Sequence, residues 1–151
     1  MSELPEGWQW CTVKELSHLV TSGSRDWSKF YSASGAYFVR SAEINDYTLR
    51  LSEAIHVALP KKVEGKRTLI EKGNILVTIT GANVGKCAKV DGDIPEAYVS
   101  QSVALIKIAK EELAPFVYFA MRSPNVGGEA VIRDGLRGRS PCFELASNQI
   151  S

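Results

Sequence analysis

The chain has 151 residues, of which 44% are hydrophobic and 23% are charged, and its formal net charge is +1. These values predict one soluble domain large enough to bury its own core, and they argue against a protein that binds polyanions through bulk positive charge. No apolar run approaches membrane-spanning length, the N-terminus lacks a signal-peptide pattern, and the three cysteines are widely spaced. We therefore expect a cytoplasmic protein with neither a disulfide framework nor a cysteine metal site.

The first part of the chain is predicted to contain a short helix and a polar loop. Thr12 and Glu15 have the spacing of a capping box, which predicts a helix at residues 13–19. The loop at residues 21–31 interleaves basic and aromatic side chains, a combination that can attract phosphates and stack on bases. A folded surface loop without any ligand fits the same pattern. Short strands are expected to follow at residues 36–40 and 54–57.

The most informative segment is a pair of predicted strands within residues 72–90. Between the strands lies a tip bracketed by Gly81 and Gly85, and glycines let the backbone adopt positive φ and approach a ligand closely. A phosphate-binding nucleotide loop would need four residues between its glycines, Ser or Thr after the lysine, and a helix start. Here three residues separate the glycines, and Cys87 and a strand-like stretch follow Lys86. A nucleotide site is therefore the least favoured interpretation.

The remaining elements are a predicted strand at residues 98–108 and a helix with a broad apolar stripe at residues 111–122. Basic residues concentrate at residues 61–89, with seven Lys or Arg against two Glu, and again around Arg137 and Arg139. Local positive charge suits a partner whose phosphates are one contact among several, although composition alone favours a solvated face without a partner. The residues offer no pairing of nucleophile, base and carboxylate, so we expect no enzyme activity in this chain.

Taken in order, these segments resemble the target recognition domain of the specificity (S) subunit of type I restriction–modification systems. The segments that carry the resemblance are the LPEGW opening with its short helix (4–19), the TSGSRDW loop (21–31), FVR (38–40), GNILVT…GA…GK (73–86), and YVSQ…ALI (98–106) followed by a helix. The fold we expect is α+β: a twisted, mostly antiparallel, partly barrel-like sheet with a few short helices. Residues 1–151 are then one recognition domain, truncated before the helical spacer of such subunits.

The resemblance implies a function that needs no catalytic residue in this chain. The domain would recognise double-stranded DNA sequence-specifically, reading one half of a bipartite target. Its partners would be modification (methyltransferase) subunits and a restriction (translocase and endonuclease) subunit. S-adenosylmethionine, ATP and Mg²⁺ are expected on those partners, and no cofactor or metal in this chain. The alternative is a protein–protein adaptor without DNA readout, docking through aromatic side chains and the stripe of the predicted helix at residues 111–122.

The candidate DNA-binding residues lie in polar loops and turns that the resemblance places at the DNA. Arginine can contact guanine, and Asn or Gln adenine, through paired hydrogen bonds, so the predicted base readers are Arg25, Asn83, Gln101, and Arg137 or Arg139. The predicted phosphate contacts are Lys29, Lys62, Arg67 and Lys86. Surface ion pairs for the arginines, and internal hydrogen bonds for Ser100 and Gln101, are equally compatible alternatives. The full set is Ser22, Ser24, Arg25, Trp27, Lys29, Tyr31, Arg40, Lys62, Arg67, Thr78, Thr80, Asn83, Lys86, Ser100, Gln101, Arg137 and Arg139.

Overall fold

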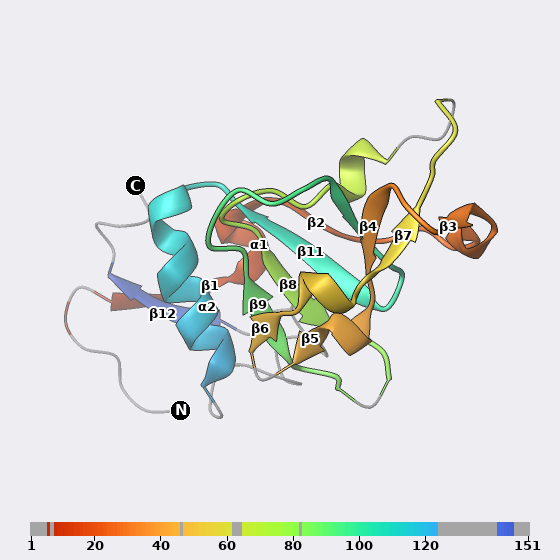
Figure 1. Cartoon of the computed structure of the whole chain (residues 1–151). Coiled ribbons are helices and arrows are strands. Elements are labelled where there is room, and N and C mark those ends of the chain that lie inside the picture. The colour runs from red at the N-terminus through yellow and green to blue at the C-terminus, as the bar shows by residue number, and fades with distance from the viewer. Residues whose placement is uncertain are drawn as a thin grey trace.

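Short strands form most of the regular structure (Figure 1). The computed structural model describes residue 6 and residues 8–45, 47–61, 65–81, 83–123 and 142–146, with the backbone alone at 8–10 and 142–146. The strands are β1 (Trp8–Thr12), β2 (Ser17–Ser22), β3 (Tyr31–Ser32), β4 (Ala36–Val39), β5 (Ile44–Asn45), β6 (Thr48–Leu49), β7 (Ile55–Val57), β8 (Ile75–Thr78), β9 (Cys87–Lys89), β10 (Ala97–Val99), β11 (Val103–Ile108) and β12 (Cys142–Ala146). The α-helices are α1 (Val13–Leu16) and α2 (Ala114–Arg122). Single 3-10 turns are η1 (Trp27–Phe30), η2 (Ser41–Glu43), η3 (Leu51–Glu53), η4 (Lys66–Thr68) and η5 (Glu111–Leu113).

The centre of the fold is the antiparallel sheet β2–β11–β8–β9. Every residue of β8 and β11 is buried, because both faces of the sheet are covered. Ile75 and Val77 pack in the cluster that contains side chains of α1 and α2, whereas Leu76 between them packs in the cluster that contains β4 and β10. This alternation is the two-residue period of a strand, and it explains why β8 reads as a continuous apolar run.

A second sheet, β10–β4–β7–β3, lies beside the first and carries its own small core. Its pairings are antiparallel except for β4 with β10, which is parallel. The small core gathers Trp27, Phe38, Val57 and Tyr98. The two remaining sheets are two-stranded, β1 with β12 and β5 with β6.

Two predicted elements differ from the observed ones. The capping box exists, with the Glu15 N–H donating to Thr12 Oγ1 at 3.1 Å and the Thr12 N–H donating to Glu15 Oε2 at 2.6 Å. The helix nevertheless ends at Leu16, because residues 17–22 pair with β11 as β2. The predicted strand at residues 98–108 is divided into β10 and β11 by a turn at residues 100–102, which brings Gln101 to the surface.

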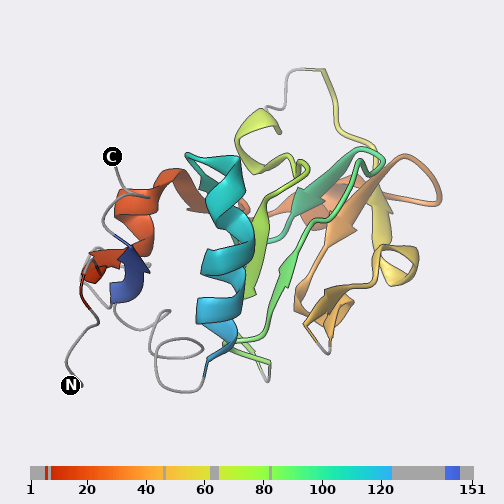
Figure 2. The ribbon, with the colours of Figure 1, turned by 90° about the vertical axis from the view of Figure 1, so that its left-hand side faces the viewer.

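Helix α2 lies alongside the central sheet (Figure 2), and the buried residues of its apolar stripe face that sheet. Val117 and Met121 are buried against the central sheet, where α2 lies along β9. Phe119 points away from that interface and is 62% exposed. No helix in the described part of the chain is both long and apolar enough to cross a membrane.

The α+β fold class and the mostly antiparallel pairing are confirmed. Among the described strands, β4 with β10 is the parallel pair. The sheets formed by the described strands do not close into a barrel. The second sheet packs on the face of the first that carries Leu76, Ala88 and Leu105. The Ser100–Ser102 turn carries the chain from β10 to β11.

Candidate nucleic-acid interface

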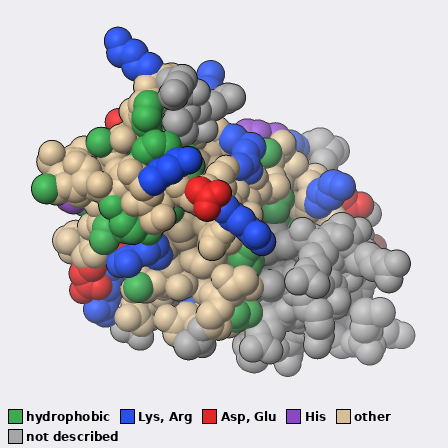
Figure 3. Space-filling model, turned by 90° about the vertical axis from the view of Figure 1, so that its right-hand side faces the viewer, with side chains coloured by type: hydrophobic (Ala, Val, Ile, Leu, Met, Phe, Trp, Pro, Cys, Tyr) green, Lys and Arg blue, Asp and Glu red, His purple; other side chains and the backbone are tan. Residues whose placement is uncertain are grey.

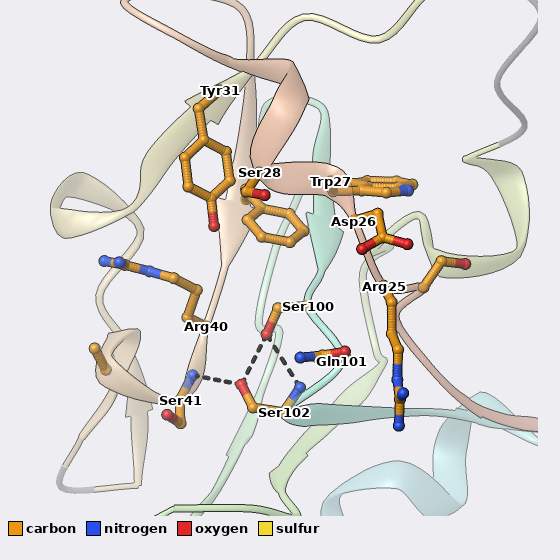
Figure 4. Close-up of a pocket in the computed structure, with 13 residues that line it drawn as sticks. Arg25, Asp26, Trp27, Ser28, Tyr31, Arg40, Ser41, Ser100, Gln101 and Ser102 are labelled. Carbon is orange, nitrogen blue, oxygen red and sulfur yellow. Dashed lines mark hydrogen bonds between the residues drawn. The ribbon is translucent and has the colours of Figure 1, made fainter.

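Four polar segments that are distant in the sequence meet around one concave surface, which we call the polar hollow. Figure 4 shows the part of it that residues 24–31, 40–42 and 100–102 line. They are residues 22–31, residues 40–42, Thr80, and the turn at residues 100–102. The concavity consists of two adjoining cavities of about 390 and 570 Å³ that share Arg25, Asp26, Ser28 and Gln101. The lining residues are Ser22, Gly23, Ser24, Arg25, Asp26, Trp27, Ser28, Tyr31, Phe38, Arg40, Ser41, Ala42, Thr80, Ser100, Gln101 and Ser102.

Trp27 fixes the first loop to the body of the domain. Its indole is only 5% exposed, stacks on Phe38 with ring centroids 5.5 Å apart, and meets the edge of Tyr98 at 5.4 Å. The chain reaches this position through Asp26, whose φ of 68° is left-handed. Burial of this large ring holds the exposed neighbours Arg25 and Asp26 at the hollow. Trp27 lines the hollow but is packed against core aromatics, so its role as a direct DNA contact remains a prediction.

The same loop is held at its start by backbone contact with β10. The Gly23 N–H donates to the Ser100 carbonyl at 3.0 Å. A Cβ at Gly23 would lie 2.1 Å from the Val99 carbonyl oxygen, so a side chain cannot be accommodated there without displacement of the backbone. Glycine is required at this position by the close approach of two chain segments.

Arg67 also holds this loop. Its guanidinium donates to Thr21 Oγ1, to the Ser22 carbonyl at 3.0 Å and to Ser24 Oγ at 3.1 Å. Arg67 was predicted to contact a phosphate, but in this structure its N–H donors bind acceptors of the same chain. Arg67 positions the loop in this structure, and Ser22 and Ser24 are its acceptors.

The turn at residues 100–102 combines internal and exposed polar groups. Ser100 is 5% exposed, and its Oγ lies 2.8 Å from Ser102 Oγ. The Ser102 hydroxyl in turn accepts the Ser41 N–H at 3.4 Å, which joins this turn to the η2 segment. Ser100 is therefore a structural hydrogen-bonding group. Gln101 is exposed at the tip of the turn, and its amide projects into the hollow toward Arg25 (Figure 4).

The glycine-bracketed tip follows Thr80, and a Cβ at Gly81 would lie 3.9 Å from Ser41 Oγ. Gly81 and Gly85 have φ of 100° and 95°, so both occupy the left-handed region that the sequence predicted for this tip. Strand β9 follows, and no helix starts there, which rules out the nucleotide-loop interpretation. Thr80 is exposed and lines the hollow. Asn83 is half-buried, and its carbonyl accepts the Lys86 N–H at 3.0 Å.

Two predicted residues near this tip lie away from the hollow. Thr78 is fully buried at the base of the tip, so it cannot contact a duplex in this conformation. Lys86 Nζ lies 4.9 Å from the ring centroid of Tyr47, and the Arg122 guanidinium lies 4.5 Å from the same centroid. Lys86 is thus directed toward α2.

Arg40 and Glu43 form a paired unit on the side of the hollow below Tyr31. Arg40 Nη2 donates to Glu43 Oε1 at 2.8 Å, and Glu43 is almost fully buried. This hydrogen bond raises the pKa of the Arg40 guanidinium. Tyr31 is 49% exposed, and its hydroxyl points toward Arg40 (Figure 4). Sequence reasoning selected Arg40 and missed Glu43, although the spacing of three residues could have suggested a cap.

Basic side chains are spread over the side of the molecule that carries β3 and β7. Figure 3 shows Lys and Arg across the centre of this face, with fewer Asp and Glu among them. Within the hollow itself the charged groups are Arg25, Arg40 and Asp26. Lys29 is exposed beside it, with Nζ 5.3 Å from the ring centroid of Phe30. Positive charge beside neutral hydrogen-bonding groups is the composition expected of a surface that contacts phosphates and base edges.

The predicted residues thus fall into three groups. The hollow brings together Ser22, Ser24, Arg25, Trp27, Tyr31, Arg40, Thr80, Ser100 and Gln101. Lys29, Arg67, Thr78, Asn83 and Lys86 lie outside its lining. Lys62, Arg137 and Arg139 lie outside the described residues. Sequence reasoning missed Ser41 and Ser102, which carried no pattern of their own. In the described part of the chain, no group of His, Cys, Asp and Glu is arranged to hold a metal ion.

Comparison with known proteins gives a consistent result for the fold. No protein-family model and no curated protein match the sequence. Among solved structures, a chain from a study of assembly and conformational transition of the type I R-M system matches with a TM-score of 0.64 at 16% identity, over 99% of this chain and 37% of that one. The HsdS subunit from Thermoanaerobacter tengcongensis matches with a TM-score of 0.60 at 16% identity, over 99% of this chain and 36% of that one. The type I restriction–modification S subunit from M. genitalium matches with a TM-score of 0.57 at 18% identity, over 96% of this chain and 36% of that one. The chain therefore has a fold found in type I specificity subunits, and it spans little more than a third of their length.

Proposed function

On the premise that its fold is one found in type I specificity subunits, we propose that this chain is a non-catalytic DNA recognition domain. It reads one half of a bipartite double-stranded target on behalf of a type I restriction–modification complex. Modification subunits and a restriction subunit are its proposed partners in the cytoplasm. S-adenosylmethionine, ATP and Mg²⁺ belong to those partners in this proposal.

The observation that carries the proposal is the convergence of four polar segments on the polar hollow. Arg25 and Gln101 are exposed there and are joined by Thr80 from the glycine-bracketed tip. Buried groups such as Trp27 fix the backbone of the loops from which these exposed side chains extend. A fixed backbone that carries hydrogen-bonding side chains to one surface supports readout of base edges.

The adaptor alternative has less support. Its docking face was predicted on the helix at residues 111–122, and Val117 and Met121 of that helix pack into the core. Phe119 is exposed, but a single exposed aromatic side chain is normal for a monomeric protein and does not make a docking patch.

Selection of bound duplexes from a random pool by this chain tests the proposal. We expect enrichment of one short motif, and weaker binding of that motif by Arg25→Ala, by about 1–3 kcal/mol if Arg25 makes a paired contact to a base. Lys72→Ala is the matched control. Lys72 lies at two other cavities, outside the hollow, and its substitution by Ala removes the same charge as Arg25→Ala. Enrichment of no motif, or equal losses in the two variants on cognate and random duplexes, would refute sequence readout through the hollow.

A further inference from the structure

Glu43 is a carboxylate buried beneath the edge of the polar hollow, with an exposed fraction of 1%. Its Oε2 accepts the backbone N–H of Arg40 at 2.6 Å and Arg40 Nε at 3.4 Å, while Oε1 accepts Arg40 Nη2 at 2.8 Å. The backbone of Glu43 is fixed as well, since its N–H donates to the Arg40 carbonyl at 3.1 Å and its carbonyl accepts the Arg50 N–H at 2.8 Å. The carboxylate therefore has one well-defined position.

The fixed carboxylate of Glu43 also fixes the position of the Arg40 guanidinium that is bonded to it. A buried carboxylate that loses its cation is strongly destabilising, so Arg40 cannot turn away from Glu43 without a large cost. Nevertheless, the Arg40 side chain remains 39% exposed and lines the hollow. The result is an arginine that is accessible to a ligand but held in one orientation.

The ion pair with Glu43 occupies one edge of the Arg40 guanidinium and leaves the other edge available to a ligand. Nε and Nη2 face the carboxylate, whereas Nη1 makes no hydrogen bond within the described residues. Nη1 and the second N–H of Nη2 point in parallel along the remaining edge. Two parallel donors match O6 and N7 of guanine, and they also match two oxygens of a phosphate.

Charge and rigidity distinguish these two ligands. The Arg40–Glu43 pair is neutral overall, so it attracts a phosphate and displaces counterions less than an unpaired arginine does. Its hydrogen-bond donors are unaffected by the neutralisation. Phosphate contacts tolerate a mobile side chain, whereas base readout depends on fixed direction. The neighbouring Ser41 and Ser102 are neutral hydrogen-bonding groups, as a base edge requires.

We propose that Arg40 reads a guanine of the target, and that Glu43 is the positioning residue that makes this readout rigid. This inference rests on the proposed DNA recognition and names the base that one side chain selects. It differs from recognition by the exposed Arg25, for which no structural partner fixes the guanidinium in the described residues.

The test uses duplexes that the wild-type chain selects from a random pool, remade with 7-deazaguanine at each guanine in turn. This base replaces the N7 acceptor by C–H and leaves pairing intact. We expect one position at which the replacement weakens wild-type binding, by less than the roughly 5- to 150-fold of a whole paired contact because O6 remains an acceptor. Arg40→Lys keeps a positive charge near Glu43, but its one nitrogen cannot satisfy the buried carboxylate and also present two parallel donors to a base. It should therefore bind the natural duplex more weakly and be insensitive at that position. Lys72→Ala, which removes a positive charge outside the hollow, is the control and should keep the sensitivity there.

Glu43→Gln separates positioning from structural support. It should lose most of the discrimination between guanine and 7-deazaguanine at that position while keeping its affinity for random duplexes. A purely structural Glu43 would lower the unfolding temperature and leave the discrimination ratio unchanged. If Glu43→Gln does not fold, Arg40→Lys alone decides.

The outcomes distinguish this inference from the function on which it rests. If a motif is enriched but Arg40→Lys keeps the wild-type sensitivity at every guanine, the inference is wrong and the proposed function stands. Equal loss on cognate and random duplexes identifies Arg40 as a phosphate contact and likewise overturns the inference. If no motif is enriched at all, the proposed function fails, and the inference fails with it.

Discussion

Arg67 gives the sharpest test of how the loop at residues 21–24 is held. Arg67→Ala removes three hydrogen bonds to neutral acceptors of that loop, on Thr21, Ser22 and Ser24. These bonds are exposed, so each contributes near the lower end of the usual range, and together they contribute about 1–2 kcal/mol. For a chain of this size the unfolding temperature should fall by roughly 2–8 °C. Lys66→Ala is the matched control, because Lys66 is the exposed preceding residue of η4.

Hydrogen exchange measures the local effect directly. The Gly23 N–H is protected by its hydrogen bond to the Ser100 carbonyl, 3.0 Å away. A local loss of 1–2 kcal/mol should accelerate exchange of this amide by about 5- to 30-fold in Arg67→Ala and leave it unchanged in Lys66→Ala. The reasoning is refuted if the Gly23 amide exchanges equally fast in both variants while Arg67→Ala lowers the slope of log binding constant against log salt concentration by about one. That result would show that Arg67 contacts a phosphate, as the sequence predicted.

Three further substitutions test other parts of the structure. Gly23→Ala should destabilise the fold by about 1–3 kcal/mol in chemical denaturation because its Cβ meets a carbonyl at 2.1 Å. Gly92→Ala, with nothing within 4 Å, should be close to neutral, and equal losses in the two variants would contradict the packing argument. Thr78→Val should stabilise by about 1 kcal/mol, because the buried Thr78 hydroxyl has no hydrogen-bond partner in the described residues. A loss of DNA affinity in Thr78→Val would instead indicate that Thr78 contacts DNA, as the sequence predicted. Burial, and then the hydrogen bond to Glu96, raise the pKa of Tyr98 from 10 to about 12. The neutral phenol is thus favoured by folding, and its stabilisation is complete below pH 10 and lost as the pH rises toward 12. Tyr98→Phe should remove this part of the loss of folding stability at alkaline pH. An unchanged dependence of the unfolding free energy on pH would show that Tyr98 ionisation is not its cause.

The sequence predicted well where a local pattern has one structural solution. The capping box at Thr12 and Glu15 depends on neighbouring residues and is present. The glycines at 81 and 85 adopt positive φ because their tip must reverse the chain between β8 and β9. The helix at residues 13–19 was predicted too long because helical spacing competes with pairing to β11, and that pairing involves residues more than 80 positions away.

The candidate interface was predictable in its composition and not in its detail. The loop at residues 21–31 was expected to carry basic and aromatic side chains, and its Arg25 and Tyr31 line the hollow together with Gln101. Which of them faces outward was beyond local reasoning. Trp27 points inward because Phe38 and Tyr98, brought from two other strands, provide the cavity that buries it.

By itself, the sequence determined which residues could form strands, turns and caps, and which segments were polar enough to meet a partner. These properties follow from side-chain chemistry and from spacing within a few residues. Only the tertiary structure decided that Arg67 is directed at its own chain, that Arg40 is paired with a buried carboxylate, and that four separate segments border one hollow. The direction of a long side chain depends on the groups that surround it, and those groups are assembled only when the two sheets pack together.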